Sequence, residues 1–197
     1  EIHSGDWSSD VCSSDLLASP GVVEKVHLGG DVGVLALHGR LEKRTEWLAE
    51  VVATSTGASL YTVTLPPDLW WHVPSTRFGE TPSPRLAAFL GRVRRVVSIH
   101  GYGRPGLEHS VLLGGRNRRL AAAVAAHVRA TGLLAAVDDL EAIPRGLRGM
   151  AAANPVNLPP EAGVQVEVPG GARSGRRFDA LAEALAAAVG RGQSPGN

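Results

Sequence analysis

The chain contains one cysteine and no long apolar run, and each shortage excludes a class of protein. The single cysteine, Cys12, cannot close an intramolecular disulfide or build a thiolate metal site. Because no apolar run approaches the roughly 18 residues of a membrane-spanning helix, we expect no membrane segment. The G-x-S-x-G elbow, the phosphate-binding loop and the C-x-x-C pair are also missing. Their absence excludes the usual signatures of serine hydrolases, P-loop enzymes and thiol oxidoreductases.

The first 16 residues differ in character from the rest of the chain. Residues 5–16 read GDWSSDVCSSDL, which resembles an in-frame translation of a sequencing adapter, is rich in Ser and Asp and lacks apolar periodicity. We interpret residues 1–16 as a non-native tail that packs on nothing; a native disordered tail is the alternative. Leaving out its four acidic residues raises the formal net charge from +1 to +5. The predicted domain is then 17–190, followed by a loose tail at 191–197.

Runs rich in Val, Leu and Ile alternate with Ala-rich runs along the predicted domain. This alternation predicts a single α/β domain with a mixed, mainly parallel sheet and helices on both faces. Two long segments without periodicity, 66–80 and 138–163, are expected to be functional loops. Strands are expected at 22–27, 33–37, 59–65, 93–99, 110–113, 133–137 and 164–168, and helices at 42–54, 82–91, 117–131 and 177–189.

Several helix boundaries have a residue-level rationale. Thr81 is expected to cap a helix that has Pro82 at its first position, where a missing N–H costs nothing. Gly57 and Gly132 each follow a helical run and are expected to adopt the left-handed conformation that ends a helix.

Two histidines stand where apolar, strand-like runs end. VGVLAL leads into His38, with Glu42 four residues later, and VRRVVSI leads into His100. In an open α/β sheet, ligands gather outside the carboxyl ends of the strands. Two imidazoles and a carboxylate form a common catalytic zinc set. If a helix begins near Gly39, His38 and Glu42 share one of its faces. On spacing alone, an ordinary loop histidine beside a helix-dipole carboxylate remains the favoured alternative.

A second carboxylate lies inside a β-branched run near the end of the domain. In GVQVEVP, Gln165 and Glu167 alternate with valines and therefore face the same side of a strand. A buried carboxylate there could act as a general base, whereas an edge strand with one solvated face is the alternative. In WWHVPSTRF, His72 is a further catalytic candidate. Trp70 and Trp71 could offer a stacking surface, although core packing is the favoured role for at least one of them.

Two motifs of this sequence are typical of nucleotide or nucleic-acid binding, and we reject both. The G-x-G-x-x-G string at 101–106 follows a strand, but Pro105 and another strand-like run come next instead of the helix that a dinucleotide site needs. The strings GRVRR and GRNRR lack interleaved aromatic residues. A solvated basic surface explains them better than nucleic-acid binding does.

Six ordered segments resemble one known family. ALHGRLEKRT, WHVPSTRF, SIHGY, LLGGRN, NPVN and GVQVEV follow the order of the zinc-dependent poly-γ-glutamate hydrolases, relatives of the zinc carboxypeptidases, over most of residues 20–173. The resemblance implies a zinc-carboxypeptidase-like fold. It also implies that His38, Glu42 and His100 hold Zn²⁺, and it overturns the loop alternative for the first two.

The resemblance also implies roles for residues around the metal. Glu167 matches the general base of the family's Q-x-E segment, and His72 or a nearby cation would steady the oxyanion. Arg40 departs from the pattern, because it replaces the second glycine of an HGG string. The candidate substrate contacts are Arg40, Arg77, Tyr102, Asn154, Asn157 and Arg173.

The resulting prediction is a zinc-dependent hydrolase of amide bonds in glutamyl polymers or peptides. A non-catalytic polyanion-binding protein that keeps the fold is the alternative. We expect neither a nucleic-acid nor a membrane partner, and the sequence says nothing of the oligomeric state. No signal peptide is visible, which favours a cytoplasmic location. Secretion stays open because the adapter-like segment could stand in place of a native start.

Overall fold

A seven-stranded mixed sheet runs through the protein, with the strand order β1-β3-β2-β4-β7-β5-β6. The computed structural model describes residues 12–190. Strands β3, β2, β4 and β7 are parallel neighbours, whereas β1 and β5 pair antiparallel with β3 and β7. The predicted mixed, mainly parallel sheet is therefore confirmed. The strands are β1 (Val23–His27), β2 (Val32–Gly39), β3 (Ser59–Thr64), β4 (Arg95–Tyr102), β5 (Ser110–Leu113), β6 (Ala135–Val137) and β7 (Gly163–Pro169).

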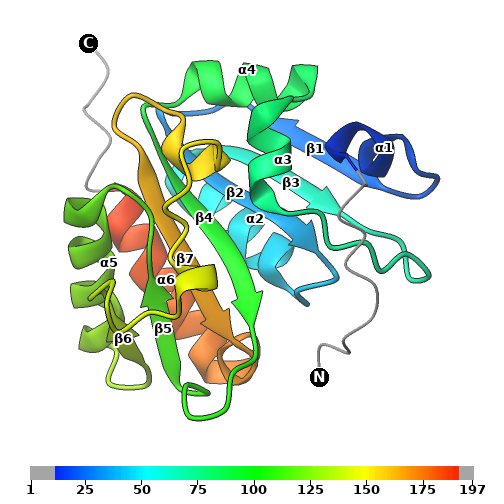
Figure 1. The fold of residues 1–197 in the computed structure, drawn as a ribbon. Helices are drawn as coiled ribbons and strands as arrows, with labels where there is room; N and C mark the ends of the chain where they lie inside the picture. Colours follow the sequence, from blue (N-terminus) through cyan, green and yellow to red (C-terminus); the bar gives the residue numbers. More distant parts are fainter. Residues whose placement is uncertain (1–11, 191–197) are drawn as a thin grey trace.

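Helices cover both faces of this sheet (Figure 1). On one face, α2, α5 and α6 bury alanines, leucines and valines against the central strands. On the other face, α1, α3, α4 and the short helix η2 pack over β2, β3 and β4. The helices are α1 (Ser13–Ala18), α2 (Thr45–Thr56), α3 (Ser75–Glu80), α4 (Pro84–Arg92), α5 (Arg118–Ala130) and α6 (Gly175–Gly190), with 3-10 turns η1 (Arg145–Leu147), η2 (Pro155–Asn157) and η3 (Gly170–Ala172).

The central strands are buried on both faces, so alternation decides where each side chain points. On β7, Val164 and Val166 pack under α5 and α6, which leaves Gln165 and Glu167 on the opposite face. His100 lies directly beside Glu167 in the parallel β4–β7 register. The sheet therefore presents His100 and Glu167 side by side on the face that α3 and η2 cover.

One irregularity in β2 changes the direction of His38. From Ala36 to Gly39, β2 advances by three residues, whereas the paired stretch of β3 advances by two, from Thr62 to Thr64. Strict alternation would have placed His38 on the face of Ala36, which packs under the α2 side. The extra residue instead lets His38 contact Phe78 of α3, with ring centroids 6.4 Å apart. His38 thus joins the face that carries His100.

Helix boundaries differ from the prediction at two places. The helix expected from Pro82 with a Thr81 cap begins at Pro84 instead, and Ser83 Oγ accepts a hydrogen bond from the Leu86 N–H at 3.0 Å. Both sites offer a hydroxyl before a proline, and the structure uses the second. Helix α2 begins at Thr45, later than the predicted position 42. Gly57 and Gly132 do adopt positive φ after their helices, as expected.

The expectation that residues 1–16 pack on nothing is wrong for residues 12–16. Leu16 of α1 is fully buried in the cluster beneath α3 and α4. Ser13 Oγ donates a hydrogen bond to the Arg77 carbonyl at 3.1 Å. Burying a leucine is favourable by about 1.5–3 kcal/mol, whatever the origin of the segment. Residues 1–11 and 191–197 lie outside the described part of the chain. Within that part, no helix is long and apolar enough to cross a membrane.

Candidate metal centre

A tight turn after β2 brings His38 and Glu42 together. The Glu42 N–H donates to the His38 carbonyl at 2.9 Å, which closes the turn before α2 begins. Arg40, Lys43 and Arg44 all adopt positive φ in this short stretch. The prediction that one face of a helix pairs His38 with Glu42 is therefore wrong in its geometry. A strained turn achieves the same juxtaposition.

His38, Glu42 and His100 form a buried cluster at the carboxyl ends of β2 and β4. One ligand atom from each lies within 4.8 Å of the other two, and all three side chains are buried. His38 Nδ1 is 3.0 Å from Glu42 Oε1, and His100 Nδ1 is 3.4 Å from Glu42 Oε2. The structure thus brings the three predicted ligands to one point.

The hydrogen bonds of this cluster fit a bound cation. His38 Nε2 lies 2.8 Å from the Val73 carbonyl, which can only accept, so this nitrogen carries the proton of the neutral ring. His38 Nδ1 then presents a lone pair to the Glu42 carboxylate at 3.0 Å. Two acceptors that face each other are unfavourable unless a proton or a metal ion lies between them. On the other ring, His100 Nε2 pairs with Ser98 Oγ at 3.0 Å and leaves Nδ1 facing Glu42. Partners of this kind orient metal-binding imidazoles.

The pKa shifts of the three side chains also fit a bound cation. Burial lowers the pKa of His38, even though the Glu42 carboxylate acts in the opposite direction. Burial would raise the pKa of Glu42, but His38 and His100 hold it well below its ordinary value. The pKa of His100 is raised, because Glu42 and Glu167 together outweigh the effect of burial. An ionised carboxylate beside a neutral imidazole is a donor set suited to a divalent metal.

Backbone and side-chain donors hold Glu42 from two further directions. The Gly101 N–H donates to Glu42 Oε2 at 2.9 Å. The Arg173 guanidinium donates to the Glu42 carbonyl and, at 3.3 Å, to the Lys43 carbonyl. A Cβ at Gly101 would lie 2.6 Å from Arg173 Nη1, so glycine is needed for this packing. Arg173, which the sequence suggested as a substrate contact, uses its guanidinium inside the protein to fix the Glu42 turn.

A chain of buried amides leads to Glu167. Asn154 Nδ2 donates to Gln165 Oε1 at 2.9 Å, and Gln165 Nε2 donates to Glu167 Oε1 at 2.8 Å. The Val156 N–H donates to Asn154 Oδ1 at 3.3 Å, which fixes the orientation of the whole chain. Burial raises the pKa of Glu167 to about 7, although His100 pulls it down. Asn154 therefore contacts Gln165 within the protein, and Glu167 is a buried carboxylate that can exchange a proton near neutral pH.

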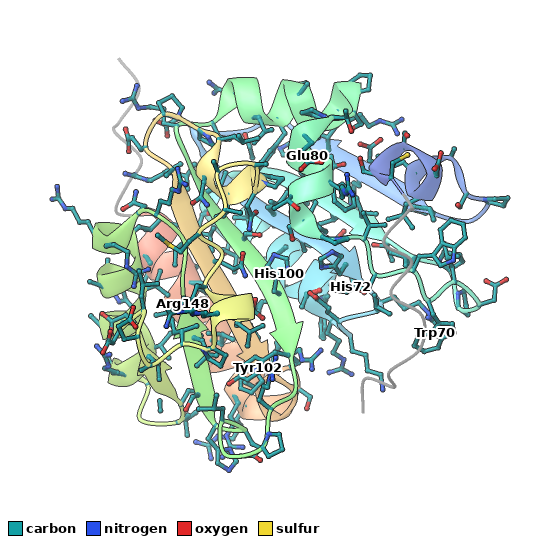
Figure 2. The ribbon with its side chains drawn as sticks, viewed as in Figure 1. Trp70, His72, Glu80, His100, Tyr102 and Arg148 are labelled. Carbon is teal, nitrogen blue, oxygen red and sulfur yellow. The ribbon has the colours of Figure 1, made fainter. Side chains whose placement is uncertain are left out.

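The loop that precedes α3 supplies His72. Its Nε2 lies 3.5 Å from Glu42 Oε1, and its ring centroid is 4.3 Å from that of His38. The His72 side chain is 38% exposed, unlike the buried histidines beside it. His72 thus lies beside the buried cluster and is partly open to solvent. Figure 2 shows it next to His100.

The remaining predicted substrate contacts have different surroundings. Tyr102 is buried, and its hydroxyl lies 2.7 and 2.6 Å from the Leu107 and Ser110 carbonyls. Asn157 donates to the Gly149 and Ala151 carbonyls and accepts from the Arg116 N–H. Arg77 pairs with Glu80 within α3. The Arg40 guanidinium lies over the Trp70 ring, 5.4 Å from its centroid.

Sequence reasoning did not identify the groups that orient the cluster. Ser98, the Val73 carbonyl and the Gly101 N–H each hold a predicted ligand, and Gln165 holds Glu167. Ser98 and Gln165 each lie two residues before a predicted site residue on the same strand. A polar residue two before a strand-end histidine or carboxylate was therefore the available signal. Backbone groups leave no signal in the side-chain pattern.

Comparison with known proteins agrees with this geometry. A family model described as poly-gamma-glutamate hydrolase matches residues 16–183. A bacteriophage poly-gamma-glutamate hydrolase structure matches with a TM-score of 0.73 and 26% identity, over 85% of this chain and 87% of that chain. A zinc-free apo form of YNDL matches with a TM-score of 0.69 and 21% identity, over 86% and 89% of the two chains. The Atu2144 gene product of Agrobacterium tumefaciens matches with a TM-score of 0.52 and 17% identity, over 87% and 92%.

No curated protein matches the sequence. The family match nevertheless extends over most of the chain, including every strand of the sheet and all residues of the buried cluster. It confirms the family that the six sequence segments resemble. The bacteriophage poly-gamma-glutamate hydrolase also shares the fold of this chain. The chain belongs to the poly-gamma-glutamate hydrolase family.

Proposed function

We propose that this protein is a zinc-dependent hydrolase of the amide bonds in γ-linked glutamyl polymers. One observation carries the proposal: a buried His38–Glu42–His100 cluster lies beside the buried carboxylate of Glu167, which neighbours His100 in the sheet register. Two imidazoles and one carboxylate are a common catalytic set for zinc. The zinc-free apo form of YNDL, which shares the fold, supports zinc as the metal.

The three ligands would leave room for water and substrate at the metal. Bound zinc supplies Lewis acidity, lowering the pKa of a water molecule and polarising the scissile carbonyl. His38 and His100 direct Nδ1 toward Glu42, and their other ring nitrogens are fixed by Val73 and Ser98. The cluster is therefore organised before the metal binds, which limits the cost of ordering its ligands.

Glu167 is our candidate general base. Its pKa of about 7, caused by burial, lets it accept a proton from the attacking water and return that proton to the leaving amine. The Gln165 amide donates to one carboxylate oxygen, so the other oxygen is left to take the proton. Asn154 fixes the direction of that amide and thereby positions Glu167. A protein that only bound a polyanion would have no need of this buried, oriented carboxylate.

His72 is our candidate for steadying the charge that develops on the carbonyl oxygen. It is the partly exposed member of the histidine group and approaches Glu42 from the solvent side. An N–H of a histidine in this position can donate to an oxyanion. Of the predicted substrate contacts, we retain Arg40 and Arg77, whose guanidinium groups do not fix the backbone of the site.

Zinc-restored hydrolysis tests this proposal. The protein is stripped with a chelator, dialysed, and assayed on γ-linked and α-linked pentaglutamate before and after addition of equimolar zinc. We expect zinc to restore cleavage of the γ-linked oligomer, detected by mass spectrometry of the products. Activity that survives complete zinc removal would overturn the metal assignment. Bound zinc without cleavage of either oligomer would overturn the substrate assignment.

A further inference from the structure

The turn that carries Glu42 holds a strained cation at its second position. Arg40 adopts φ 66°, a left-handed conformation that costs an L-residue energy and that glycine adopts freely. It lies two residues after His38 and two before Glu42. A long basic side chain therefore leaves the turn between two candidate ligands, at a backbone position that glycine would adopt at lower cost.

Trp70 fixes the direction of this side chain. The Arg40 guanidinium carbon lies 5.4 Å from the centroid of the Trp70 ring, within the range of a cation–π contact. Trp70 is 64% exposed and belongs to the loop that also supplies His72. Figure 2 shows Trp70 on the side of His72 away from His100. The pair thus connects the two segments that border the cluster.

The stacked guanidinium keeps its hydrogen-bond donors for another partner. Stacking uses the face of the group, whereas its N–H donors point outward in the plane. No ion pair joins Arg40 to a carboxylate within the described part of the chain, in contrast to Arg85, Arg129 and Arg148. A planar fork of this kind matches a carboxylate with two parallel hydrogen bonds.

The chemistry of the substrate determines which carboxylate could reach this fork. In a γ-linked chain, the nitrogen of each scissile amide is bonded to a Cα that carries a free α-carboxylate. In the interior of an α-linked chain, that same Cα carries the next peptide carbonyl, and the carboxylate lies two methylene groups farther away. A cation fixed close to the metal therefore distinguishes the two linkages on the leaving-group side.

We propose that Arg40 and Trp70 form a carboxylate subsite that binds the α-carboxylate of the leaving glutamyl residue and selects γ-linked over α-linked substrate. The subsite deepens the function proposed above and depends on it. Trp70 restricts the guanidinium to one direction, and Arg40 supplies the two hydrogen bonds.

The test is calorimetric titration of γ-linked and α-linked pentaglutamate into zinc-loaded protein. Glu167→Gln serves as the background, so that neither oligomer is cleaved. Adding Arg40→Gly, which also relieves the strained φ, should weaken binding of the γ-linked oligomer by about 10-fold to 100-fold, as expected for lost charged hydrogen bonds. Binding of the α-linked oligomer should change by less than about 3-fold.

Four further variants separate the subsite from a general loss of charge or fold. Arg40→Lys keeps the positive charge but lacks the planar pair of N–H donors, so it should keep only part of the affinity for the γ-linked oligomer. Trp70→Ala should weaken γ-linked binding less than Arg40→Gly does, whereas Trp71→Ala, the neighbouring exposed tryptophan, should not weaken it. Arg119→Ala removes an exposed cation on α5 and serves as the charge control.

The outcomes separate this subsite from the proposed function. Equal weakening of both linkages, or equal binding with and without Arg40, would overturn the subsite alone. Failure of the background protein to bind the γ-linked oligomer would overturn the proposed substrate and the subsite with it. If Arg40→Gly lowers zinc content or the unfolding temperature, the Trp70→Ala and Trp71→Ala pair decides the question.

Discussion

Two polar clusters in this protein, one partly buried and one buried, show opposite kinds of hydrogen bonding. Between β1, β3 and α4, Tyr61 Oη donates to Glu24 Oε1 at 2.7 Å, and Ser83 Oγ donates to the same oxygen. Arg85 completes the group with an ion pair to Glu24 at 3.4 Å. Every polar atom in this structural cluster meets a partner of the opposite kind.

The metal cluster is arranged in the opposite way. His38 Nδ1 and His100 Nδ1 both approach the Glu42 carboxylate, and the other nitrogen of each ring already has a partner. The structural cluster is complete without a ligand and stabilises the fold. In the His38–Glu42–His100 cluster, the acceptor Nδ1 of His38 faces the acceptor carboxylate of Glu42, and this contact becomes favourable only with a proton or a metal ion between the two atoms. The comparison teaches that mismatched partners in a buried group, more than burial itself, identify a site.

The largest effect is expected from His100→Ala. Two remaining ligands hold zinc poorly, so both the metal and the hydrolytic activity should be lost. The zinc content of the dialysed protein is measured by mass spectrometry. The hydrolytic activity is measured with γ-linked pentaglutamate. Zinc content near that of wild type would contradict the assignment of His100 as a ligand.

Glu167→Gln should separate metal binding from chemistry. The substitution keeps the size of the side chain but removes the base, so hydrolysis should fall by about 10²-fold to 10⁴-fold. Zinc content should stay near wild type, because Glu167 is not among the three ligands. Loss of zinc from this variant would make Glu167 a ligand and our assignment of its role wrong.

Gln165→Met tests the amide chain behind Glu167. Methionine fills a similar volume without an N–H donor, so Glu167 loses the hydrogen bond that orients it. A hydrogen bond to a charged group contributes about 1.5–3 kcal/mol, which corresponds to a kcat decrease of about 10-fold to 100-fold. The KM and the zinc content should stay within about 2-fold of wild type, since neither the substrate subsite nor the ligands change. Unchanged kcat would show that Gln165 has only a structural role.

The smallest effect is expected in the structural cluster. Burial and the Glu24 carboxylate raise the pKa of the Tyr61 phenol, which therefore stays protonated as a donor. Tyr61→Phe removes that donor and should lower the free energy of unfolding by about 1 kcal/mol, measured by urea denaturation. Zinc content and kcat should be unchanged. A drop in zinc content would show that the two clusters are coupled, against our comparison.

The sequence predicted that Gln165 and Glu167 share one face of β7, because this strand follows simple alternation. Valines on one face of β7 left Gln165 and Glu167 on the other, and the structure places them there. The same reasoning would place His38 on the wrong face, because the extra residue in β2 reverses its direction. Nothing in VGVLALHG indicates an irregularity, since neither glycine nor proline occurs in the four residues before His38.

The turn after β2 could not be predicted from the sequence pattern either. Positive φ usually appears at glycine, yet Arg40, Lys43 and Arg44 adopt it here. Without a turn signal, a helix that starts near Gly39 was the simpler prediction. Helix α3 was missed because its six residues show no periodicity. The fold class could be predicted from repeated local patterns, whereas the site depends on single backbone irregularities.

The measurement that tests our account most directly is anomalous diffraction at the zinc edge from crystals grown with zinc. We predict a single strong peak about 2.0–2.2 Å from one donor atom of each of His38, Glu42 and His100, with Glu167 outside the coordination sphere. A peak at another place, or one with Glu167 as a ligand, would contradict the account. So would a zinc-soaked crystal with no density among these three side chains.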